Sequence, residues 1–228
     1  MLSRRDIKPE LLDDAEPNEA RGNLADLVRI NRYFGGHSTI RRMLERVVTP
    51  EEPFTLLDIG AASGDAAQMI VRSYPKAQVT SLDKHAVNLE AAPVPKLQAD
   101  AFRLPFAPGS FDFVMSSLFL HHFSDEDVTA LLRSFRSIAR RGVLIADLER
   151  HVLPLIFLTL SKPLFGWGRI TVHDGLRSVR AAFRASELKK LAEAAGIDSP
   201  SVEVHRPAFR LTLLATNLRA SALPPASR

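Results

Sequence analysis

The stretch Phe54-Thr-Leu-Leu-Asp-Ile-Gly-Ala-Ala-Ser-Gly-Asp65 decides the fold of this chain. A short apolar run comes first, and Gly60 and Gly64 follow it. A strand that enters a glycine-rich turn and continues into a helix is typical of the start of an open α/β sheet. Glycines at such a turn let a ligand approach the backbone and the free amide groups at the start of the helix. The stretch therefore predicts both a fold class and a ligand-binding edge.

Strands and helices alternate along the chain after this turn. Continuously apolar strands that alternate with helices indicate a parallel sheet covered on both faces. A tightly connected strand pair follows near the end, and we expect this pair to be antiparallel. Strands are expected at 54–59, 77–83, 96–100, 111–116, 142–147, 202–205 and 209–216, and helices at 65–74, 85–92 and 125–139.

Segments with other patterns flank or interrupt this region. Residues 1–50 are expected to form a polar, acidic leader followed by two cap helices, at about 23–34 and 38–48. Residues 51–218 are expected to form the α/β domain, and 219–228 a flexible tail.

Within the domain, residues 150–184 break the rhythm. They show no period of a strand or helix, so we expect an irregular insertion that acts as a lid over the site. Ser186 is expected to cap a helix that ends at Gly196.

The composition excludes several classes of protein. The chain has 228 residues, of which 46% are hydrophobic and 25% charged, and this is ordinary for a globular domain. It has no cysteine, which excludes disulfide scaffolds, cysteine-ligated zinc and a cysteine nucleophile. The net charge of +4 comes from scattered arginines and not from a basic run, which favours an arginine-rich surface over a nucleic-acid partner.

The sequence carries no sign of export or of a membrane span. The first 20 residues are polar and lack the apolar core of a signal peptide. The most apolar stretch, Val152 to Leu160, is too short to cross a bilayer. We therefore expect a cytoplasmic protein.

Acidic residues close the second and third expected strands. Asp83 lies about two dozen residues after the start of the glycine turn, where a carboxylate can accept hydrogen bonds from both hydroxyls of a ribose. Asp100 closes the next strand, and the strand 111–116 then leads into the loop Ser116-Ser-Leu-Phe-Leu-His-His-Phe123.

This ordered set resembles class I S-adenosylmethionine-dependent methyltransferases, in particular the type-11-like small-molecule branch. The resemblance covers about residues 54–148. It implies a Rossmann-like, doubly wound sheet of seven strands, mostly parallel with an antiparallel last strand. It also implies an N-terminal helical cap and an insertion after strand five.

The resemblance implies S-adenosylmethionine as the cofactor and assigns its site. The glycine turn wraps the methionine moiety, and Arg32 of the N-terminal cap is a candidate partner for its carboxylate. The acid after strand two holds the ribose, and the residues after strand three meet the adenine. The loop after strand four lies under the sulfonium. The residues assigned in this way are Asp58, Gly60, Ala61, Gly64, Asp83, Lys84, Asp100, Ala101 and Ser116, and no metal ligand is expected. Arg32 lies outside the resemblance and is a separate candidate, with a surface salt bridge as the alternative interpretation.

One residue departs from the pattern of the family. Ala62 stands where the family often has a third glycine, and its methyl group is expected to be tolerated. A nicotinamide-dependent dehydrogenase is disfavoured, because the Gly-x-Gly-x-x-Gly pattern and a Tyr-x-x-x-Lys pair are both absent.

Absent motifs and nearby histidines narrow the methyl acceptor. No Asn- or Asp-Pro-Pro-Tyr motif follows strand four and no cysteine is present, which disfavours nucleic-acid bases. His122 is the first candidate for a general base that takes the proton of a phenol or enol, and His121 and His173 are alternatives. Core packing is the competing interpretation for His121, and a turn capped by Asp174 for His173.

The sequence therefore predicts a methyltransferase that acts on a hydroxyl of a small, lipophilic phenol, quinone or polyketide. The N-terminal segment and residues 150–175 resemble those of bacterial enzymes with such acceptors. Two alternatives stay open: methylation of a ring carbon of a quinone-like acceptor, and a non-catalytic subunit that binds the cofactor. The apolar segment 152–167 is expected to contact the acceptor or a membrane surface.

Overall fold

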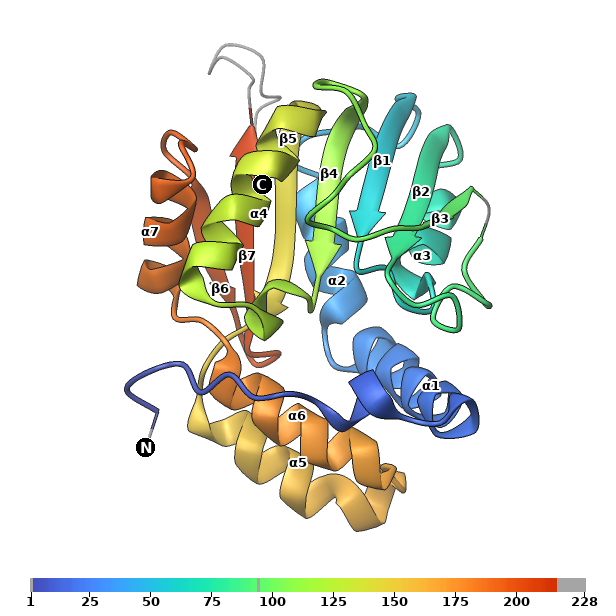
Figure 1. Cartoon of the computed structure of the whole chain (residues 1–228), viewed down its shortest axis with the longest axis vertical. Coiled ribbons are helices and arrows are strands. Elements are labelled where there is room, and N and C mark those ends of the chain that lie inside the picture. The colour runs from blue at the N-terminus through green and yellow to red at the C-terminus, as the bar shows by residue number, and fades with distance from the viewer. Residues whose placement is uncertain (1, 94, 217–228) are drawn as a thin grey trace.

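The computed structural model of the chain describes residues 2–93 and 95–216 (Figure 1). The tail expected at 219–228 lies outside the described residues.

A seven-stranded sheet forms the centre of the described part of the chain. Its order is β3-β2-β1-β4-β5-β7-β6, and only β7 is antiparallel to its neighbours, β5 and β6. The order reverses between β1 and β4, so the carboxyl ends of these two strands flank a topological switch point. The fold class predicted from the sequence is confirmed. The strands are β1 (Phe54–Ile59), β2 (Ala77–Asp83), β3 (Lys96–Gln98), β4 (Phe111–Ser117), β5 (Ala139–Leu148), β6 (Ser201–His205) and β7 (Arg210–Thr216).

Helices cover both faces of the sheet. α2 (Gly36–Leu44) and α3 (Asp65–Ser73) pack on one face, where Leu56 and Leu144 are fully buried. α4 (Asp125–Ile138) and α7 (Ala185–Ala194) pack on the other face around Phe135. The two apolar clusters hold the strands between them.

A third group of elements lies beyond the carboxyl ends of the parallel strands, at the bottom of Figure 1. It contains α1 (Pro17–Tyr33), α5 (Val152–Phe165) and α6 (Arg169–Ala181). The N-terminal leader, with a 3-10 turn at Leu11–Asp14, runs along this group. The amides of Leu11 and Leu12 donate to the carboxylate of Asp174 on α6. No helix among the described residues is long and apolar enough to cross a membrane.

The expectation of an irregular insertion at 150–184 is wrong, because this segment folds into α5 and α6. The first seven residues of α5 are apolar except for Pro154, so no polar face reveals the helical period. Pro154 lies in the first turn of α5, where the missing amide costs no hydrogen bond. His151 caps this helix, with its Nδ1 accepting from the amide of Leu153 at 3.2 Å.

Two further local expectations are wrong. Residues 86–91 form successive turns and not the helix expected at 85–92. Asp83 competes for the local donors there, because its Oδ1 accepts from the amide of His85 and from Nδ2 of Asn88. The residue before α7 is Arg184 and not Ser186, and Glu187 accepts from the amide of Arg184 at 2.9 Å.

The glycine turn between β1 and α3 has a tightly defined backbone. Gly60 has a φ of +70°, and a Cβ there would lie 2.4 Å from Cδ2 of Phe119. Gly64 has a φ of +68°, and a Cβ there would lie 2.7 Å from Cβ of Ala92. Ala62 also has a positive φ, +46°, although it carries a side chain. Its amide donates to Oδ2 of Asp83 at 3.0 Å, which holds the residue in this conformation.

Replacing Ala62 by glycine should therefore stabilise the protein. Removing the Cβ relieves the left-handed backbone, and the expected gain is about 0.5–1 kcal/mol in the free energy of unfolding. Urea denaturation measures this gain. Ala61→Gly is the matched control: its φ is not positive, so it should destabilise. Equal losses in both variants would contradict the strain at Ala62.

Candidate active site

A cavity of about 1580 Å³ lies between the carboxyl ends of the strands and the group of α1, α5 and α6. The glycine turn, the end of β2 and the loop after β4 line one side of it. Apolar side chains of α1 and α5 line the other side. Among the predicted site residues, the lining includes Asp58, Gly60, Ala61, Asp83, Lys84, Asp100, Ala101, His121 and His122.

Asp58 is a buried carboxylate at the end of β1. It is 1% exposed, and its Oδ2 has no hydrogen-bond partner. Burial first, and then the negative charges of Asp65 and Asp83, raise the pKa of Asp58 to about 8. A ligand with a hydrogen-bond donor or a positive charge would stabilise the ionised form of Asp58 and lower its pKa.

Asp83 ends β2 and supports the glycine turn. Its two oxygens accept three hydrogen bonds, from the amides of Ala62 and His85 and from the side chain of Asn88, all at 3.0 Å. A carboxylate has about four acceptor positions, so Asp83 retains capacity for a ligand hydroxyl. Asp58, the glycine turn and Asp83 thus fit a nucleoside that carries an amino-acid end.

Three predicted cofactor residues lie outside the cavity lining. Gly64 shapes the turn from behind, against Ala92. Ser116 is fully buried and its hydroxyl is unpaired, whereas the next residue, Ser117, lines the cavity. Arg32 is exposed, and its guanidinium lies 5.5 Å from the ring centre of Tyr33. The structure therefore does not bring Arg32 to the cavity.

His121 forms a buried pair with Asp147, the penultimate residue of β5. Its Nδ1 lies 2.6 Å from Oδ1 of Asp147, and its backbone amide donates to Oδ2. Burial lowers the pKa of His121, but the charge and hydrogen bond of Asp147 outweigh it, so the pKa is raised. The same pairing holds the pKa of Asp147 below its usual value despite burial. The partners are 26 positions apart and nothing in the sequence signals their pairing, so sequence reasoning missed Asp147.

His122 lies beside this pair and differs from it electrostatically. Its ring centre is 4.2 Å from that of His121. Burial first, and then the charge of His121, lower the pKa of His122 to about 3. Its Nδ1 is 3.7 Å from Glu10 of the leader, a residue that also accepts from the hydroxyl of Ser178. His122 is therefore neutral near pH 7.

Donor atoms of Glu10, His121 and His122 all lie within 4.8 Å of one another. A metal ion would need neutral His121, because a protonated imidazole cannot ligate. A metal ion would therefore compete with a proton for His121, whose pKa Asp147 raises. His173 does not line the cavity, and its Nδ1 contacts Asp174 at 2.7 Å.

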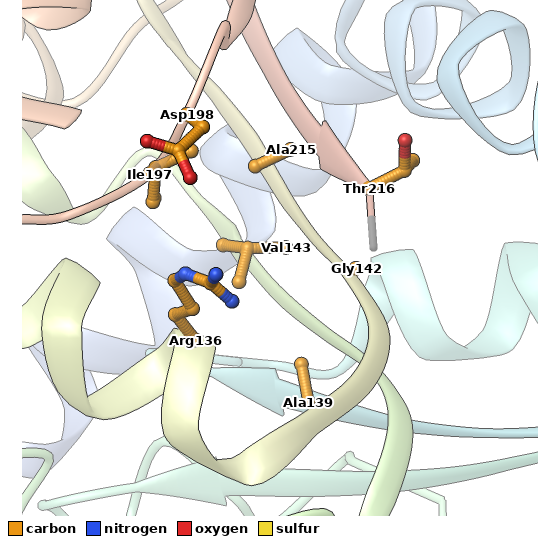
Figure 2. Close-up of a pocket in the computed structure, with 8 residues that line it drawn as sticks. All are labelled: Arg136, Ala139, Gly142, Val143, Ile197, Asp198, Ala215 and Thr216. Atoms are coloured by element: carbon orange, nitrogen blue, oxygen red, sulfur yellow. The ribbon is translucent and has the colours of Figure 1, made fainter. Parts of the chain in front are cut away.

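A second, smaller pocket of about 360 Å³ lies at the opposite end of the sheet (Figure 2). The start of β5 and the end of β7 form its walls, and Arg136 and Asp198 reach into it. It contains no residue that the sequence assigned to the site.

Comparison with known proteins finds a family match over part of the chain. Residues 57–146 match the family described as methyltransferase domain. A malonyl-[acyl-carrier protein] O-methyltransferase from Xylella fastidiosa is 32% identical over 119 residues, which are 48% of this chain and 40% of that protein. A demethylmenaquinone methyltransferase from Thermotoga maritima is 28% identical over 129 residues, which are 54% of this chain and 56% of that protein. The chain thus spans about half the length of these curated relatives.

A solved structure extends the likeness over most of the chain. The plantazolicin methyltransferase in complex with SAH superposes with a TM-score of 0.64 at 12% identity, covering 90% of this chain and 92% of that one. At this identity the likeness shows the fold. Residues 57–146 thus match a methyltransferase-domain family, and most of the chain shares the fold of this solved methyltransferase.

Proposed function

We propose that this protein uses S-adenosylmethionine to methylate a hydroxyl of a small, lipophilic phenol, quinone or polyketide. The observation that carries the proposal is the shared cavity. It joins the glycine turn and Asp83 to an apolar wall, and His121, which pairs with Asp147, also lines it.

The residues of the turn side fit the cofactor. S-adenosylmethionine, when bound, supplies an electrophilic methyl group on a sulfonium. We assign the amino-acid end to Asp58, Gly60 and Ala61, because all three line the cavity and an unpaired buried carboxylate oxygen lies there. We assign the ribose to Asp83. We assign the adenine to Lys84, Asp100 and Ala101, which line the adjoining wall.

The opposite wall fits a lipophilic acceptor. It includes Ile30 of α1, Phe34 just after α1, Ile156 and Phe157 of α5, and Trp167 between α5 and α6. Apolar side chains continue from the cavity to the surface of α5, where Leu160 is 72% exposed. We include in the proposal that segment 152–167 contacts a membrane surface from which the acceptor enters. The exposed apolar face supports this contact.

His121 is the better-supported base. Asp147 binds Nδ1, which leaves Nε2 as the atom that accepts the proton of the acceptor hydroxyl. The negative charge of Asp147 then stabilises the imidazolium. His122 has a low pKa and is a poor proton acceptor, so its proposed role is to hydrogen-bond the acceptor. His173, outside the lining, carries no role in this proposal.

Methylation of a ring carbon is the second candidate. The demethylmenaquinone methyltransferases among the relatives favour it by their names. The same base would then take the proton from the ring carbon after the new C–C bond forms.

Replacement of Asp83 by alanine tests the cofactor site. Titration calorimetry with S-adenosylhomocysteine should show a loss of about 1.5–3 kcal/mol, the contribution of hydrogen bonds to a charged group. Thermal unfolding must be followed in parallel, because Asp83 also holds Ala62. Asp198→Ala at the far pocket is the control and should bind normally. Unchanged affinity in Asp83→Ala would remove the ribose assignment, and no binding to the wild type would reject the function.

Asp58→Asn should make the protein more stable at pH 8 than the wild type. The folded-state pKa of Asp58 is raised to about 8, so its stabilising contribution is complete below pH 3.8 and is lost as the pH rises towards 8. The variant lacks this loss, and its advantage in free energy of unfolding should grow from pH 5 to pH 8 and reach about 1–3 kcal/mol. A difference that does not change with pH would show that Asp58 is already ionised at little cost.

The dependence of turnover on pH distinguishes the two histidines. If His121 is the base, turnover rises with pH through an apparent pKa above 6.5, because only the neutral imidazole accepts a proton. In His121→Gln this rise of turnover with pH should disappear, and turnover should fall by a factor of about 10²–10⁴. If His122 is the base, the rise of turnover with pH lies near its pKa of about 3, below the assay range, and His122→Gln should lose more turnover than His121→Gln. A small loss in both variants would mean that positioning alone suffices.

A further inference from the structure

Arg210 is a buried cation whose side chain has no hydrogen bond or ion pair within residues 2–93 and 95–216. It is the first residue of β7, in register with Leu148 of β5 and His205 of β6. Arg210 is 4% exposed and lines the cavity. Its Nε is buried with no hydrogen-bond partner, and no carboxylate among the described residues forms an ion pair with its guanidinium.

The nearby acids do not neutralise Arg210. Asp147 lies one position away on β5 and gives both its oxygens to His121 and the amide of Leu148. Asp65 accepts from Asn31 and contacts His37 at 2.8 Å. Burial lowers the pKa of Arg210 to about 10, and the charges of these two acids offset only part of the effect.

The other cations of the cavity lining are in a different situation. Arg42, Lys84 and Arg206 are exposed, and Arg206 pairs with Glu149 at 2.7 Å. Water therefore screens them, whereas Arg210 is shielded from water. An unpaired charge in such a place is costly, and a bound anion removes the cost. The planar guanidinium matches a carboxylate, which it can bind through two parallel hydrogen bonds.

We infer that Arg210 is the anion-binding residue of this cavity and receives a carboxylate group of a bound ligand. The carboxylate has two sources within the proposed function, on which this inference rests. One is the amino-acid end of the cofactor, for which the exposed Arg32 is badly placed. The other is a carboxylate on the methyl acceptor. In the same cavity Asp58 supplies a buried carboxyl group with an unpaired oxygen, which suits a ligand that carries a hydrogen-bond donor as well as a carboxylate.

Calorimetry with paired ligands separates these sources in the wild type and Arg210→Met. S-adenosylhomocysteine carries the carboxylate, and 5′-methylthioadenosine lacks the amino-acid end. If the cofactor supplies the carboxylate, the variant binds S-adenosylhomocysteine 10- to 100-fold more weakly and methylthioadenosine equally well. For the acceptor, 4-hydroxybenzoate and its methyl ester are added with and without S-adenosylhomocysteine. If the acceptor supplies the carboxylate, the wild type prefers the acid and the variant does not.

Stability and a matched variant complete the test. Ligand-free Arg210→Met should melt at or above the temperature of the wild type, since an unpaired buried charge is removed. Arg206→Met removes an exposed, paired arginine of the same cavity and should keep the ligand preferences. If Arg210→Met does not fold, Arg210→Lys keeps the charge without the planar fork and should weaken the same ligand about 10-fold.

The outcomes that overturn the inference differ from those that reject the proposed function. Equal affinity of wild type and variant for S-adenosylhomocysteine, with no preference of either for the acid over the ester, overturns the role of Arg210. Failure of the wild type to bind either nucleoside rejects the methyltransferase proposal, and the acid–ester comparison then decides on Arg210 alone.

Discussion

The carboxylate of Asp83 is the interaction on which the site depends. Asp83 ends β2 and accepts a hydrogen bond from the amide of Ala62, which holds that residue in its left-handed conformation. It also accepts hydrogen bonds from His85 and Asn88, so the chain after β2 forms turns and not a helix. The glycine turn and the end of β2 are therefore one hydrogen-bonded unit. Because that unit lies where the strand order reverses, no crossover helix covers it, and it stays open to a ligand.

Charge placement distinguishes this cavity from a simple apolar pocket. Asp58 and Arg210 are both buried and lack full hydrogen bonding, whereas Asp147 and His121 satisfy each other. In a low-dielectric site an unpaired group retains its full interaction with a ligand. The protein thus accepts a cost in the ligand-free state at two positions, and such positions are typical of binding sites.

The sequence predicted the parts of the fold that rest on local patterns. The strands, the glycine turn and the antiparallel end follow from short apolar runs, and these are confirmed. α5 was missed because apolar residues occur on all sides of its first half, so the sequence there shows no alternation of apolar and polar residues with the helical period. The turns at 86–91 were missed because the carboxylate of Asp83, just before them, accepts hydrogen bonds from His85 and Asn88 and so competes with helix formation.

The candidate site was predictable only where the residues lie next to one another in the chain. The glycine turn and the acidic residues at the ends of strands were predicted from such local patterns. The partnership of His121 with Asp147 and the isolation of Arg210 depend on strand neighbours, which a single sequence does not specify. Arg32 was a reasonable choice by composition, but its helix turns it away from the cavity.

The N-terminal leader has a consequence for how the protein is made. The amide of Asp6 donates to the carbonyl of Arg180, and Nε of Arg5 donates to the carbonyl of Ala181, a separation of 176 residues. Arg5 also donates to the carbonyls of His121 and Phe123 in the site loop. Contacts between such distant residues form late in folding. During synthesis the sheet can begin to assemble while the leader is still unattached, because its partners on α6 are made late. The cavity is complete only after Arg210 of β7, which also lines it, has left the ribosome.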